Sequence, residues 1–236
     1  MSKLLVDEIS DADGTGPVTV TDGIIVNGTI KLDGNYPVGT GNVALGDTAL
    51  DSNVSGGSNV AIGANALTAN TASNNTAVGK GALQANTASN NIALGKTAGF
   101  TNTTGTENVF IGSESSASGY AAGYLNTTGS QNVAVGNNAL AQNTTASQNT
   151  AVGYQAAYST TTAANNTAVG YQALRTNTTG YNAAFGSQAL YYNTTGTANT
   201  AVGPYGPMHL NTTGSYNTAL GETALYSNTT ASNNTA

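Results

Sequence analysis

The stretch NTAVGYQAL at residues 166–174 contains the unit that decides the fold: an Asn, a small or β-branched residue, Ala, an aliphatic residue and Gly. The unit returns at intervals of 16 to 18 residues, except for one interval of 24 after Asn108. So short a repeat cannot bury a core alone and is stable only when stacked on its neighbours. We therefore expect an all-β fold, a parallel β-solenoid or β-roll of about twelve coils of about 17 residues. The repeating Asn is found at Asn42, Asn59, Asn75, Asn91, Asn108, Asn132, Asn149, Asn166, Asn182, Asn199, Asn217 and Asn234.

The two residues before each Gly must face opposite ways, because side chains alternate along an extended strand. We expect the residue directly before Gly to form the core, since it is apolar in every complete copy. We expect the Ala before it to face outward and pack closely against other chains, in an intertwined or side-by-side homotrimer. The predicted core row is Leu45, Ile62, Val78, Leu94, Ile111, Val135, Val152, Val169, Phe185, Val202 and Leu220. The predicted oligomer interface is Ala44, Ala61, Ala77, Ala93, Ala134, Ala151, Ala168, Ala184, Ala201 and Ala219.

The rest of each unit predicts the other walls of the coil. Gly suits a corner with positive φ, and an Ala-Leu pair such as Ala66-Leu67 predicts a second short strand. Asn-Thr-Thr-Gly or Asn-Thr-Ala-Ser then forms a polar corner, where stacked Asn side chains would make ladders. The recurring Gly and Asn argue against a helical repeat, and the regular apolar row argues against disorder.

The distribution of charge divides the chain into two parts. Residues 1–41 contain eight of the sixteen charged residues, and residues 42–236 contain the other eight. Asp22-Gly23 and Asn27-Gly28 separate alternating runs in the first part, as in β-hairpins. We therefore predict an N-terminal β attachment and capping domain at 1–41 and a repeat shaft at 42–236, with an insertion near 113–124. Since 232–236 stop within a unit, we expect more chain or another molecule to complete the last coil.

The composition disfavours several functions. Five Lys and Arg against eleven Asp and Glu give no basic patch for nucleic acid or anionic lipid. No apolar run is long enough to insert into a membrane, and the acidic N-terminus is unlike a signal peptide. The chain has no Cys and a single His, His209, and its carboxylates are scattered. We expect no enzymatic activity, no cofactor and no metal site, and we interpret the Asn-x-Thr triplets as turns rather than glycosylation sites.

Tyrosines are concentrated in the second half, where eleven of the twelve follow residue 119. Tyr154, Tyr171, Tyr191 and Tyr192 are candidates for receptor contact, because a tyrosine ring offers an apolar face and a hydroxyl to a sugar or a protein. The alternative is a stacking ladder between neighbouring coils. Both interpretations stay open at the level of the sequence.

NTAVGYQAL at 166–174 and NTTG at 177–180 resemble repeats in bacteriophage tail fibres and related virion proteins, and the opening MSKLLVDEIS with Asp13-Gly14-Thr15-Gly16 looks like the start of such proteins. The resemblance implies a trimeric fibre that assembles in the host cytoplasm and belongs to the virion tail. Other tail proteins would bind residues 1–41, and a host surface glycan or protein would meet the distal part. The repeat is also similar to the heads of trimeric autotransporter adhesins, left-handed β-rolls with a shorter period, whose export signal and anchor this sequence does not show. An ice-binding β-solenoid is a third class, although the Thr-Thr pairs here lie at corners.

Overall fold

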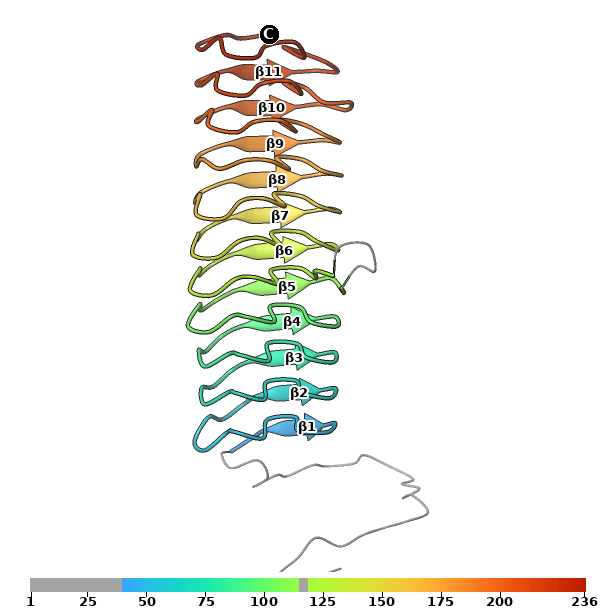
Figure 1. The fold of residues 1–236 in the computed structure, drawn as a ribbon, viewed down its shortest axis with the longest axis vertical. Helices are drawn as coiled ribbons and strands as arrows, with labels where there is room; N and C mark the ends of the chain where they lie inside the picture. The colour runs from blue at the N-terminus through green and yellow to red at the C-terminus, as the bar shows by residue number, and fades with distance from the viewer. Residues whose placement is uncertain (1–39, 115–118) are drawn as a thin grey trace, which may run out of the picture. The chain divides into compact units, whose positions relative to one another are not determined.

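The computed structural model describes residues 40–114 and 119–236, and in these residues the chain is an all-β solenoid without a helix. Eleven three-residue strands lie one above another in sequence order, and every neighbouring pair is parallel (Figure 1). The predicted parallel β-solenoid is therefore confirmed. Nearly all of the predicted N-terminal domain, 1–41, lies outside the described residues. The strands are β1 (Val43–Leu45), β2 (Val60–Ile62), β3 (Thr76–Val78), β4 (Ile92–Leu94), β5 (Val109–Ile111), β6 (Val133–Val135), β7 (Thr150–Val152), β8 (Thr167–Val169), β9 (Ala183–Phe185), β10 (Thr200–Val202) and β11 (Thr218–Leu220).

Equivalent residues of successive repeats stand directly above one another. Ala151 of β7 pairs with Ala168 of β8, for example. The register survives the longest interval, since Val109 of β5 pairs with Val133 of β6 across the insertion. A bridge between Thr218 and Thr235 begins a twelfth coil. Differences in repeat length are thus absorbed at the corners and do not shift the strands.

The two predicted faces of the strand are exchanged in the structure. The middle residue of each strand points into its own coil, and Ala61 and Ala151 are wholly buried there. The residue before Gly points outward, so that Leu45 is 47% exposed and Leu220 71% exposed. The prediction was wrong because it weighed hydropathy and ignored volume: the coil is narrow, and the space opposite the strand is already filled by leucines.

The corrected assignments follow from this exchange. The predicted core row is partly or largely exposed: Leu45, Ile62, Val78, Leu94, Ile111, Val135, Val152, Val169, Phe185, Val202 and Leu220. The predicted interface row is buried inside the chain, with Ala44 of the first coil only partly covered: Ala44, Ala61, Ala77, Ala93, Ala134, Ala151, Ala168, Ala184, Ala201 and Ala219. Apart from Ala44, these alanines therefore have no surface to offer to a second chain.

The opposite wall of the coil is a left-handed turn and not the predicted second strand. Leu67 has φ 51° and Leu140 has φ 48°, and both side chains are fully buried against the Ala row. A left-handed conformation costs a non-glycine residue roughly 1–2 kcal/mol. Burying a leucine side chain stabilises the fold by about 1.5–3 kcal/mol, so the free energy gained by burial exceeds the cost of the left-handed backbone. The buried row comprises Leu50, Leu67, Leu83, Leu140, Leu174, Leu190 and Met208.

In one coil the core is filled by different residues. Phe110 replaces Ala in the middle of β5, and its ring is wholly buried. The two facing positions of the Leu row are Gly99 and Gly123. A Cβ at Gly123 would lie 2.2 Å from Phe110 Cδ1, and one at Gly99 would lie 2.5 Å from Phe110 Cδ2. The aromatic ring thus fills space that leucines occupy elsewhere in the stack.

The Gly that ends each strand is required by the distance between coils. Gly153 has φ 132°, and a Cβ there would lie 2.4 Å from the carbonyl oxygen of Gly170 in the next coil. Any side chain at this corner would push the coils apart. The predicted corner with positive φ is confirmed.

Two ladders of asparagines run along the stack, and the sequence predicted the one at the polar corner. In the first, the Asn before each strand accepts from the next coil, as Asn59 Oδ1 does from Asn75 N at 2.9 Å. In the second, the corner Asn donates to its predecessor, as Asn102 Nδ2 does to Asn86 Oδ1 at 2.7 Å. These bonds satisfy polar groups that would otherwise be buried without partners. The members of the second ladder are Asn53, Asn70, Asn86, Asn102, Asn126, Asn143, Asn177, Asn193, Asn211 and Asn228.

The second ladder is interrupted at Thr160, which occupies the corner position of an Asn. Thr160 is fully buried. Its Oγ1 and the Oδ1 of Asn143 in the preceding coil are buried without a hydrogen-bond partner in the described structure. The threonine side chain is one atom too short to continue the ladder.

Candidate interaction surfaces

An apolar feature on the outside of the stack is the strand face, which we define as the first and third side chains of β1–β11. Ile62 and Leu94 are each 37% exposed and Phe185 is 41% exposed. At about 4.8 Å per strand the face is roughly 48 Å long. Soluble monomers rarely expose so long an apolar stripe, so the strand face is a candidate for association with another molecule.

The character of the strand face changes along the stack. Its first-position residues are mostly valine and isoleucine up to β6 and mostly threonine from β7 onward. Exposed tyrosines border the later part. Tyr181 and Tyr216, 69% and 63% exposed, lie two residues before β9 and β11. Tyr154 and Tyr171 lie two residues after β7 and β8. The first-position residues are Val43, Val60, Thr76, Ile92, Val109, Val133, Thr150, Thr167, Ala183, Thr200 and Thr218.

A second feature, the aromatic column, follows the buried Leu row on the opposite wall of the coil. It consists of Tyr158, Arg175, Tyr191, His209 and Tyr226, one from each of five successive coils. The ring of His209 stacks on that of Tyr191, with 5.2 Å between the ring centroids and 20° between the ring planes. It also stacks on the ring of Tyr226, with 5.2 Å between the centroids and 5° between the planes. The Cζ of Arg175 lies between the Tyr158 and Tyr191 rings.

These contacts bear on the four tyrosines that the sequence suggested as receptor contacts. Tyr154 and Tyr171 stack on each other at 5.7 Å and 12°, and Tyr191 stacks within the aromatic column. The stacking ladder is thus confirmed for these three. Tyr192 instead lies beside the column, nearly perpendicular to both Tyr191 and His209, and is 45% exposed. A receptor-binding role stays a prediction for all four.

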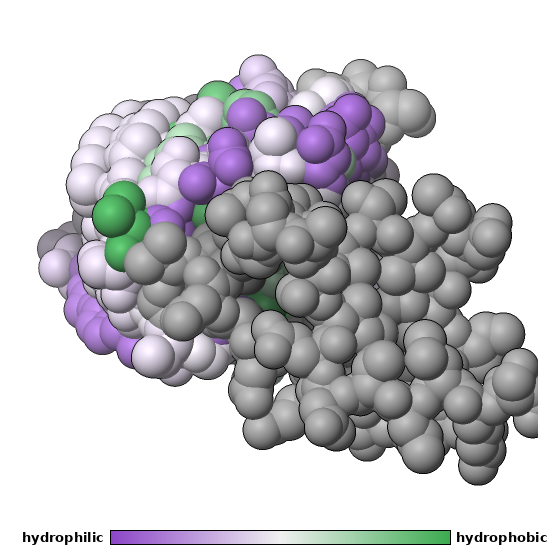
Figure 2. All heavy atoms as spheres, turned by 90° about the horizontal axis from the view of Figure 1, so that it is seen from below, coloured by the Kyte–Doolittle hydropathy of each residue, from purple (hydrophilic) through white to green (hydrophobic). Residues whose placement is uncertain are grey.

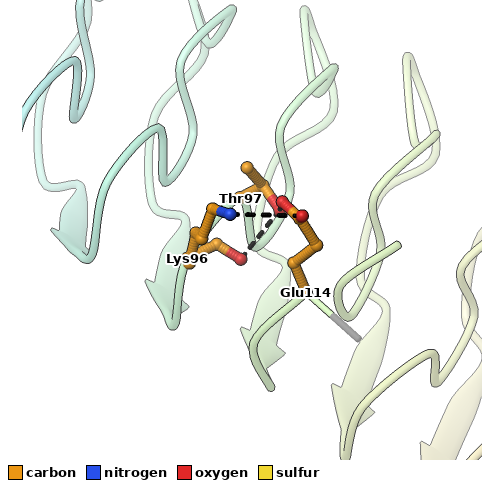
Figure 3. A network of polar contacts seen from close by, with 3 residues as sticks. All are labelled: Lys96, Thr97 and Glu114. Carbon is orange, nitrogen blue, oxygen red and sulfur yellow. Dashed lines mark hydrogen bonds and ion pairs between the residues drawn. The ribbon is translucent and has the colours of Figure 1, made fainter. Parts of the chain in front are cut away.

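One ion pair lies among the described residues. Lys96 Nζ lies 3.2 Å from Glu114 Oε1, and Thr97 Oγ1 lies 3.4 Å from Glu114 Oε2, which links two coils at the surface (Figure 3). His209 Nδ1 lies 3.4 Å from the carbonyl oxygen of Gln188 and is otherwise surrounded by aromatic rings. Within 40–114 and 119–236 no three His, Asp or Glu side chains are placed to hold a metal ion. The described part also contains no helix that could cross a membrane.

The asparagines of the Asn-Thr-Thr triplets are buried in the folded chain, except for Asn228 in the last of them, which is half-buried. Asn126 is fully buried, and its Nδ2 donates to Asn102 Oδ1 at 2.6 Å and to Gly129 O at 2.9 Å. Both hydrogens of the amide are therefore used inside the stack. This geometry agrees with the interpretation of these triplets as turns.

The insertion is anchored to the stack at its end. Ala121 and Ala122 are buried, and Tyr124 stacks on Phe100 at 5.2 Å and 4°.

Viewed along the stack, the described surface is mostly pale or hydrophilic, with separate hydrophobic groups (Figure 2). Comparison with protein-family models, with curated proteins and with solved structures found no match. The surfaces themselves therefore carry the functional argument.

Proposed function

We propose that this chain is the shaft of a homotrimeric bacteriophage tail fibre, attached to other tail proteins through residues 1–41 and contributing to recognition of the host cell. The observation that supports this is the strand face, whose third-position side chains form an apolar row that a single chain leaves partly or largely exposed along β1–β11. The interface differs from the one expected from the sequence, because the Ala row is buried within each coil. Three strand faces around a common axis would cover one another.

The energy available from this association is substantial. Covering the outward aliphatic side chains at even about 1 kcal/mol each would give on the order of 10 kcal/mol per chain. That is comparable with the stability of a whole domain. A fibre held at one end also needs its chains to run in the same direction, as they do under cyclic symmetry. The resemblance to tail fibres favours three chains.

The oligomeric state tests this proposal. We expect sedimentation analysis of the purified chain to give the mass of three copies, 23.4 kDa each. Replacing Val135 and Val152 by lysine would place charges in the centre of the strand face, and we expect monomers that keep the circular dichroism of β-structure. Thr145→Lys, at an exposed corner, is the matched control and should remain trimeric. A stable folded monomer of the unaltered chain would contradict the proposal.

A cell-surface adhesin would form the same trimer, so another measurement is needed to distinguish an adhesin from a tail fibre. Mass spectrometry of purified virions should detect this chain if it is a tail fibre. Its recovery only from cell envelopes would favour the adhesin.

An ice-binding role is the second candidate, because Thr150, Thr167 and other threonines lie on the strand face. The prediction from the sequence considered only the Thr-Thr pairs at the corners. The face is uneven, however, since Phe185 and Leu220 stand among the valines. Thermal hysteresis in a solution of the purified chain would support this candidate, and its absence would remove it.

A further inference from the structure

Arg175 is the single arginine of the chain, and it lies in the aromatic column without a carboxylate partner in the described structure. The one ion pair among the described residues, Lys96 with Glu114, lies several coils away. From residue 42 on, the sequence has three basic side chains against five acidic ones, so unpaired carboxylates are available elsewhere. A partly buried guanidinium that uses none of them is unusual for a side chain that forms strong paired hydrogen bonds with carboxylates.

The guanidinium is held in place from three sides. Its Cζ lies 5.6 Å from the ring centroid of Tyr158 and 5.5 Å from that of Tyr191. Its Nε donates to Gln155 Oε1 at 3.2 Å, and the same oxygen accepts from Gln172 Nε2 at 2.7 Å. The guanidinium therefore contacts both neighbouring coils, and its Nε donates a hydrogen bond. The two terminal nitrogens, Nη1 and Nη2, make no hydrogen bond to the described residues. Those nitrogens form a pre-organised fork for an anion, at little further cost in side-chain entropy.

An aromatic ring lies one coil away from this fork. Tyr192 is adjacent to Tyr191, with 4.6 Å between ring centroids, and stands beside the stack. The Tyr192 residue is 45% exposed. Sugars bind such rings through their apolar C–H faces, while the hydroxyl offers a hydrogen bond.

We propose that Arg175 and Tyr192 form a binding site for an acidic saccharide, in which the guanidinium holds a sugar carboxylate and Tyr192 packs against the same or the next sugar ring. The inference rests on the proposed role in host recognition and names its ligand class. The site lies across the coil from the strand face, so it remains accessible when three strand faces are covered. The acidic shaft disfavours a nucleic acid or another dense polyanion, whereas a single carboxylate needs only the one guanidinium.

The single arginine makes the site directly observable. In the full chain labelled with ¹⁵N-arginine, one set of side-chain signals reports on Arg175 alone. Titration with galactose oligosaccharides that carry one galacturonic acid residue should shift these signals, and the wholly neutral galactose oligosaccharides and acetate should not. Arg175→Tyr extends the aromatic column from Tyr158 to Tyr191, so it should keep the fold and weaken binding, measured by calorimetry, by about tenfold or more. Tyr205→Ala, a 70% exposed tyrosine outside the column, is the matched control and should bind normally.

Other results would overturn the proposal. These are equal binding of the neutral oligosaccharides, equal binding of acetate, or an Arg175→Tyr variant that binds as well as the unaltered chain. Failure of all acidic oligosaccharides, with sialylated ones tested as the second source of sugar carboxylates, would do the same. The mass of the particle distinguishes failure of this proposal from failure of the proposed fibre function. A trimer that binds no sugar refutes only the saccharide site, and a monomer that binds the sugar refutes only the trimeric fibre.

Discussion

The Phe110 ring occupies space that leucine side chains fill in other coils, and the facing residues are glycines. This arrangement gives the sharpest test of the core packing. Phe110→Ala removes a wholly buried ring opposite two residues that have no side chains. Phe→Ala substitutions in cores cost about 3–5 kcal/mol, and Gly99 and Gly123 have nothing with which to fill the space. We therefore expect a loss of stability near the upper end of that range.

Restoring the common pattern of the other coils should recover most of this loss. Gly99 and Gly123 have φ of 60° and 58°, close to the 51° of Leu67, so leucine can adopt this backbone here as it does elsewhere. Gly99→Leu and Gly123→Leu alone should destabilise the chain, because each Cβ would lie within 2.5 Å of the Phe110 ring. In the triple variant with Phe110→Ala, the leucines enter the vacated space. The substitutions should then be non-additive by about 3 kcal/mol, the upper part of the range for contacting residues.

Guanidinium unfolding followed by circular dichroism would measure these effects, and hydrogen exchange would localise them to β4, β5 and β6. Leu140→Ala, a truncation in a coil with the usual Ala and Leu pairing, controls for the loss of any large core side chain. The reasoning is refuted if Phe110→Ala is neutral, or if the triple variant is as unstable as the sum of its parts.

Three further predictions concern the polar interior and the surface. Thr160→Asn should complete the second ladder and raise the free energy of unfolding by about 1–3 kcal/mol, whereas Asn at the exposed Thr162 should not; an unchanged midpoint would show that the gap in the ladder is harmless. Asn149→Ala removes the acceptor of the Asn166 N–H at 2.9 Å and one of the two donors to the carbonyl of Ala163, which keeps Asn166 Nδ2 at 3.3 Å. The buried N–H left without a partner should cost about 1–3 kcal/mol, against little change for the exposed Asn137→Ala in the same denaturation assay. Glu114→Gln breaks an ion pair whose side chains are 51% and 27% exposed, so it should change the melting temperature very little, as surface pairs contribute about 0–1 kcal/mol; a large drop would contradict this.

The sequence was sufficient to predict the architecture because the solenoid depends on spacing. Asn and Gly must recur where the coils touch, and Gly153 shows why: no side chain fits between it and Gly170. The Asn ladder at the polar corner could be predicted for the same reason. Each corner Asn, such as Asn86, accepts a hydrogen bond from the equivalent Asn of the next coil, so its position in the repeat already implies the bond.

The orientation of the strand could not be obtained from the same pattern. Alternation separates two faces without saying which is inside, and hydropathy favours Val152 over Ala151 for the core. The structure reverses the choice because leucines enter from the opposite wall. That wall was itself misjudged, since leucine seldom adopts a positive φ and the pair Ala66-Leu67 has the pattern of a strand. Arg175 was missed because its partners come from other coils, although its place in a column of tyrosines was a usable signal.

The in-register stacking of equivalent residues gives the shaft an adjustable length. Because Ala151 and Ala168 occupy the same place in the cross-section, deleting residues 150–166 would join two matching points and remove one layer. Duplication of the same segment would add one, about 4.8 Å at a time. Recombination between repeats can therefore lengthen or shorten such a protein while the lateral contacts of each remaining coil stay the same.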